Sequence, residues 1–145
     1  MHSPPPRRLE ALTALLSPAA LRGTGPLARL MRQGGLQCVF QPLADLREGS
    51  VYAHEALIRG PQGSPLHMPD QLLAFAERER ILLDFELVCV FTALEQWGRQ
   101  MAAGRLFVNI SADALVHGVA RVGAQRLGDA VRSEERRVGK ECRSR

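Results

Sequence analysis

The sequence predicts an α/β fold, in which short strands alternate with helices, and two kinds of pattern support this. Residues 36–43, 51–58 and 106–110 are short apolar runs with the length and composition of strands. Between the second and third runs, apolar residues recur at helical spacing from Pro69 onwards and again over 81–103.

The chain before the first strand is expected to contain a lead with short helices, over 1–34. Residues 1–6 are proline-rich, and 7–16 carry leucines at helical spacing. A second helix is predicted over 26–33, because Pro26 suits the first turn of a helix and Gly34 suits the position after its end.

The first two strands are expected to be antiparallel. Only the short stretch 45–50 connects them, with Gly49 as the residue that permits the unusual backbone angle of a turn. A parallel pair needs a crossover of about a dozen residues or more. After the third strand, Ser111 is a good cap for a helix over 112–116, and a further helix is predicted over 123–131.

Composition fits one globular core. The chain has 145 residues, of which 46% are hydrophobic and 23% charged. It contains no run of about 18 apolar residues, so no membrane segment is predicted. Cys38, Cys89 and Cys142 lie far apart without C-x-x-C spacing, which argues against a zinc cluster and favours a reducing cytoplasm.

The positive charge of the chain is concentrated at its end. The net charge is +4, but residues 132–145 hold six basic and three acidic groups, which leaves 13 basic and 12 acidic groups in the rest. A nearly neutral body argues against a surface for nucleic-acid polymers.

Residues 132–145 are unusual in a second respect, because they contain Lys140, the single lysine of the chain. The stretch R-S-E-E-R-R-V-G-K-E-C from Arg132 resembles the translation of a common sequencing-adapter oligonucleotide. We therefore expect the natural reading frame to be lost near Val131, with a non-native tail over 132–145. The alternative is a genuine charged and solvated helix end.

The most informative stretch is V-Y-A-H-E-A-L-I-R, from Val51 to Arg59. Glu55 stands near the end of an apolar strand, where a carboxylate is rare unless it is paired or binds a metal. We interpret Glu55 as a ligand held by a rigid strand at the mouth of an α/β barrel. The adjacent His54 must face the other way and is expected to pack on the outer face, whereas His67 and His117 are expected to be solvated.

Three blocks in this order resemble the EAL domain of cyclic di-GMP phosphodiesterases: F-Q-P-L-A-D-L from Phe40, H-E-A-L-I-R-G-P from His54 and F-V-N-I-S from Phe107. The resemblance covers about 36–131, so we expect a truncated domain over 35–131. It implies the opening of a barrel of about 250 residues. The expected fold is thus an incomplete (β/α)8 TIM-like barrel, with an antiparallel first strand pair.

The resemblance implies roles for five residues. Glu55 and Asn109 match ligands of a divalent metal, and oxygen ligands of this kind suit Mg²⁺ or Mn²⁺. Gln41 and Arg59 match positions near the substrate, and Leu57 matches a position near its guanine end. In the family, two metals activate a water that attacks one phosphodiester of cyclic di-GMP, which gives linear pGpG.

The catalytic set is incomplete in this sequence. The family also uses carboxylates from later strands, together with a lysine and a glutamate near the attacking water, and none of these precedes Val131. We therefore expect the 145-residue chain by itself to be inactive and to aggregate, while the intact domain could form the homodimer that the family implies.

Two other functions remain open. A degenerate module could bind cyclic di-GMP or a protein partner without turnover. A small helical adaptor would leave Glu55 and Asn109 unexplained, unless these two side chains are only a buried hydrogen-bonded pair.

Overall fold

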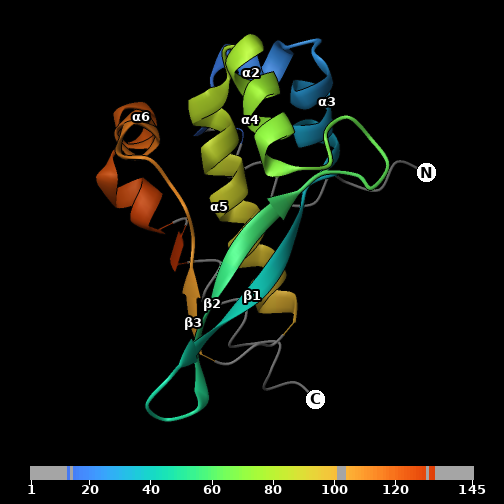
Figure 1. Ribbon diagram of the computed structural model, residues 1–145. Helices are drawn as coiled ribbons and strands as arrows, with labels where there is room; N and C mark the ends of the chain where they lie inside the picture. The colour runs from blue at the N-terminus through green and yellow to red at the C-terminus, as the bar shows by residue number, and fades with distance from the viewer. Residues whose placement is uncertain (1–12, 14, 101–103, 130, 133–145) are drawn as a thin grey trace, which may run out of the picture.

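The computed structural model describes residues 13, 15–100, 104–129 and 131–132 (Figure 1). The predicted helix over 7–16 lies mostly outside the described residues, although Leu15 and Leu16 at its end are buried. The predicted tail over 132–145 also lies outside them, apart from Arg132.

Two short helices open the described chain, α2 (Pro18–Arg22) and α3 (Pro26–Gln33). As predicted, α3 begins at Pro26 and ends at Gln33, and Gly34 follows its end. The glycine adopts a left-handed conformation with φ of 68°, and its N–H donates to carbonyls in the last turn of the helix.

The strands β1 (Gln37–Asp45), β2 (Ser50–Arg59) and β3 (Arg105–Phe107) form one sheet in the order β1-β2-β3. β1 and β2 are antiparallel, and Gly49 in their connecting turn has φ of 63°, as the sequence predicts. β2 and β3 are parallel. The arrangement is a mixed α/β fold that corresponds to the opening part of a TIM-like barrel.

The third strand is shorter than the predicted 106–110. Its ladder with β2 joins Ala53 to Arg105 and ends where Glu55 pairs with Phe107. Beyond that pair the chain leaves β2 and runs toward α5 (Leu82–Arg99), where Ser111 donates two hydrogen bonds to Glu86.

Three longer helices complete the described part of the chain: α4 (Pro69–Arg78), α5 (Leu82–Arg99) and α6 (Ala112–Val122), with further helical residues over 124–129. α5 contacts β1, β2 and α6 (Figure 1). The ring of His54 lies 5.0 Å from the ring of Trp97 on α5, which confirms that His54 packs on the outer face of the sheet.

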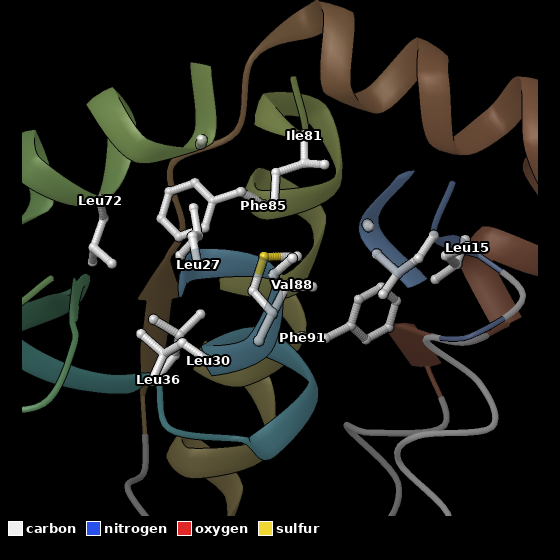
Figure 2. Close-up of a cluster of buried hydrophobic side chains, with 14 of the residues drawn as sticks. Leu15, Leu27, Leu30, Leu36, Leu72, Ile81, Phe85, Val88 and Phe91 are labelled. Carbon is white, nitrogen blue, oxygen red and sulfur yellow. The ribbon is translucent and has the colours of Figure 1, made fainter. Parts of the chain in front are cut away.

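The main hydrophobic core joins α3, α4 and the first half of α5 (Figure 2). Leu27, Leu72 and Phe85, one from each helix, are at most 2% exposed. Burying apolar side chains of this size is the main stabilising term of the fold. The core therefore fixes α5 firmly, and α5 in turn supports the sheet.

Two histidines differ from the expectation that they are solvated. His117 lies in α6, and its Nε2 atom is 3.5 Å from a carboxylate oxygen of Asp84. His67 is half-buried, and its Nδ1 atom lies 3.1 Å from the carbonyl oxygen of Gly60. Tertiary packing brings both rings to polar partners that their local sequence does not reveal.

Candidate functional site

The strand register determines which side chains share a face of the sheet. Gln41 on β1 lies directly opposite Glu55 on β2, and side chains opposite each other on paired strands point to the same side. Since His54 faces α5, its neighbour Glu55 points to the other side of the sheet. Leu57 and Arg59 follow at intervals of two residues and share the face of Glu55.

Glu55 and Asn109 meet on this face, as Asn109 follows the end of β3 by two residues. The Nδ2 group of Asn109 donates a hydrogen bond of 2.7 Å to Oε1 of Glu55. Glu55 is half-buried, whereas Asn109 is exposed. Two oxygen-bearing side chains from neighbouring parallel strands are therefore in direct contact.

The pair suits a hard divalent cation as part of a larger ligand set. A half-turn of the Asn109 amide presents its oxygen in place of its nitrogen, and the amide then supplies an acceptor. Neighbouring ligand oxygens of an octahedral Mg²⁺ lie about 3 Å apart, close to the 2.7 Å between these two side chains. Among the described residues, no group of three or more His, Cys, Asp or Glu is arranged to hold a metal ion.

The three predicted substrate residues have different surroundings. Gln41 is exposed beside Glu55, and Leu57 is half-buried. Arg59 is half-buried at the carboxyl end of β2, and its Nη1 group donates to the carbonyl oxygen of Ile58 at 2.8 Å. The structure thus places Gln41 opposite Glu55, which contacts Asn109 from the other side of β2, and places Leu57 and Arg59 farther along the same strand face.

A cavity of about 380 Å³ lies next to Asn109, between the sheet and α5. Its lining includes Leu57 and Ile58 from β2, Glu86 and Cys89 from α5, and the segment 108–111. Burial raises the pKa of the Cys89 thiol, and the nearby Cys38 and Glu86 raise it further. Cys89 therefore stays a neutral thiol near physiological pH and is a poor metal ligand.

Sequence reasoning missed Glu86, which holds the segment that carries Asn109. One carboxylate oxygen of Glu86 accepts from the backbone N–H of Ser111 at 2.6 Å, and the other accepts from the Ser111 hydroxyl at 3.0 Å. The two residues are 25 positions apart, so no local pattern could have indicated the contact. Ser111 was predicted as a helix cap, and its hydroxyl does accept from Ala114 N at 3.1 Å.

Comparison with protein families gives a match to the EAL domain over residues 25–136. Among solved structures, the chain is similar to the EAL domain of Xanthomonas citri FimX in complex with c-diGMP, with a TM-score of 0.57 and 20% sequence identity. The match covers 92% of this chain and 46% of the FimX chain, so this chain spans less than half of that domain.

A comparison with curated proteins gave no significant match. Within the described residues, no helix is both long and apolar enough to cross a membrane.

Proposed function

Because this chain belongs to the EAL domain family, we propose that it supplies the first part of a site for cyclic di-GMP and a divalent metal. In the intact domain, this site would hydrolyse cyclic di-GMP to linear pGpG. The observation that carries the proposal is the 2.7 Å contact between Asn109 and Glu55 at the carboxyl end of the parallel ladder between β2 and β3. In α/β barrels, active sites lie at this end of the strands.

Each residue has a distinct part in the proposed site. Glu55 and Asn109 would hold Mg²⁺ or Mn²⁺ through their side-chain oxygens, as two ligands of a larger set. The metal, when bound, would supply Lewis-acid activation of a water. Arg59 can bind two oxygens of one phosphate with its planar guanidinium group. Gln41 can donate to or accept from a polar substrate group, and Leu57 offers apolar contact to a base.

A second candidate is binding without turnover. It is favoured by the small ligand set: the described residues bring together one carboxylate and one amide, and no cluster of three acidic, histidine or cysteine side chains. The FimX domain with a similar fold was solved in complex with c-diGMP. For the 145-residue chain itself, we therefore expect binding and no hydrolysis. We further propose that the intact domain works in the reducing cytoplasm and that it forms a homodimer.

Nucleotide binding is the first test. Titration calorimetry would measure the affinity of the 145-residue chain for cyclic di-GMP in the presence of Mn²⁺, while chromatography would detect any pGpG. We expect binding, and we expect Glu55→Gln to weaken it at least about tenfold, because a charged ligand is lost. Glu48→Gln is the matched control, since Glu48 is exposed in the turn between β1 and β2.

Two outcomes would contradict the proposed site. If the unaltered chain does not bind the nucleotide, or if Glu55→Gln binds it as tightly as Glu48→Gln does, the assignment of Glu55 fails. Formation of pGpG would exclude the binding-only candidate and establish turnover by the chain itself.

A further inference from the structure

The segment that carries Asn109 has little support from its neighbours. The ladder between β2 and β3 ends at Phe107, so the backbone of residues 108–110 is not paired with β2. On the side toward α5, the same segment lines the 380 Å³ cavity. Neither a strand ladder nor close packing on that side therefore determines where Asn109 lies.

Among the hydrogen bonds that the structure describes, two points tie this segment to the rest of the molecule. One is the bond from Asn109 to Glu55. The other is at Ser111, which donates through its backbone N–H and its hydroxyl to the two oxygens of Glu86. Hydrogen bonds to a charged carboxylate are stronger than neutral ones, and a bidentate pair also defines an orientation.

Glu86 itself stands on a rigid support. Its neighbours on α5, Phe85 and Leu87, are 2% and 1% exposed. The hydroxyl of Ser111 also accepts from Ala114 N at 3.1 Å, and it thereby caps α6. One carboxylate thus fixes both the start of α6 and the segment that precedes it.

We propose that Glu86 is a positioning residue, which acts through Ser111 to hold Asn109 against Glu55. This inference rests on the proposed function only where Asn109 is treated as a metal ligand. The local ordering of residues 108–111 by Glu86 follows from the contacts themselves.

Amide hydrogen exchange in the full chain tests the ordering. We expect Glu86→Ala to speed the exchange of the Ser111 amide about tenfold or more, because this amide loses its acceptor, with little change in the amides of α5. The control is Glu77→Gln, an exposed glutamate on α4. An increase spread equally over α5, or no increase at Ser111, would overturn the proposal.

A double-mutant cycle on Mn²⁺ affinity tests the route through Asn109, with electron paramagnetic resonance as the readout. If Glu86 acts through Asn109, the double variant Glu86→Ala/Asn109→Ala should bind Mn²⁺ as weakly as Asn109→Ala alone. Losses that simply multiply would contradict the proposal.

Glu86→Gln provides a milder variant that should fold, because its amide oxygen can still accept one of the two bonds from Ser111. The exchange rate of the Ser111 amide in this variant should lie between the rates of the unaltered chain and of Glu86→Ala. A rate equal to that of the unaltered chain would count against Glu86 as a positioning residue. If the unaltered chain binds no Mn²⁺, the proposed function fails, but the exchange experiment still decides the role of Glu86.

Discussion

Asp84 shows how a buried acid can have a purely structural role. Its side chain is the most buried carboxylate described, in a residue that is 3% exposed, and it accepts from Ser17 N at 2.6 Å and from Ser17 Oγ at 2.7 Å. Nε2 of His117 lies 3.5 Å from the same carboxylate. Glu55, by contrast, is half-buried and is contacted by one amide. Burial alone would therefore select Asp84, an acid other than the proposed ligand Glu55.

At this scale, we predict that Asp84→Ala lowers the free energy of unfolding by about 1–3 kcal/mol, because the donors of Ser17 lose their buried acceptor. Urea denaturation followed by circular dichroism would measure the loss. Asp113→Ala is the control, since Asp113 is exposed in the first turn of α6 and should cost less than about 1 kcal/mol. Equal losses in the two variants would contradict the structural role of Asp84.

At the end of α4, an arginine occupies a backbone position that favours glycine. Arg80 has φ of 57°, and the N–H groups of Arg80 and Ile81 donate to the carbonyls of Glu77 and Ala76. This is the hydrogen-bond pattern of a Schellman motif, in which the left-handed position favours glycine. An arginine there costs about 1 kcal/mol or more, because its Cβ crowds the backbone.

We predict that Arg80→Gly stabilises the chain by roughly 0.5–1 kcal/mol, although glycine usually destabilises a protein. Arg78→Gly is matched in charge and in chemical change, but it falls within helical backbone and should destabilise by about 1 kcal/mol. The midpoint of thermal unfolding should therefore move in opposite directions for the two variants. A lower midpoint for Arg80→Gly would show that the arginine side chain contributes more than its backbone strain costs.

At the scale of the whole molecule, the sheet has two unlike faces. α5 packs on one face (Figure 1). The face that carries Glu55 also exposes apolar side chains. Val39 is 52% exposed and Phe107 is 46% exposed, and the ring of Tyr52 contacts that of Phe107. β1 and β3 form the two edges of this sheet. Exposed apolar faces and open strand edges both promote self-association.

We predict that Val39→Gln combined with Phe107→Gln reduces self-association, because it removes apolar surface from the open face of the sheet. Sedimentation velocity would measure a larger monomer fraction, and dye binding to apolar surface should fall. Leu46→Gln is the control, as Leu46 is 94% exposed in the turn beyond the last pair of the β1–β2 ladder. If the control raises the monomer fraction as much as the double substitution does, association does not occur through the sheet face.

Local chemistry in the sequence determined much of the fold. Pro26 and Gly34 set the ends of α3, Ser111 capped α6, and the short turn at Gly49 required antiparallel strands. Each of these features depends on backbone angles or hydrogen bonds within a few residues, so a single sequence reveals them. The three short blocks around Gln41, Glu55 and Asn109 likewise indicated the family that the family comparison identified.

Tertiary structure alone decided which distant groups meet. The contacts of Glu86 with Ser111, and of Asp84 with Ser17, join residues 25 and 67 positions apart. The early end of β3 at Phe107 depends on the same packing, because the chain turns from β2 toward α5 at that point. Such contacts require the helices and the sheet to be placed in space first, and local propensity carries no information about that placement.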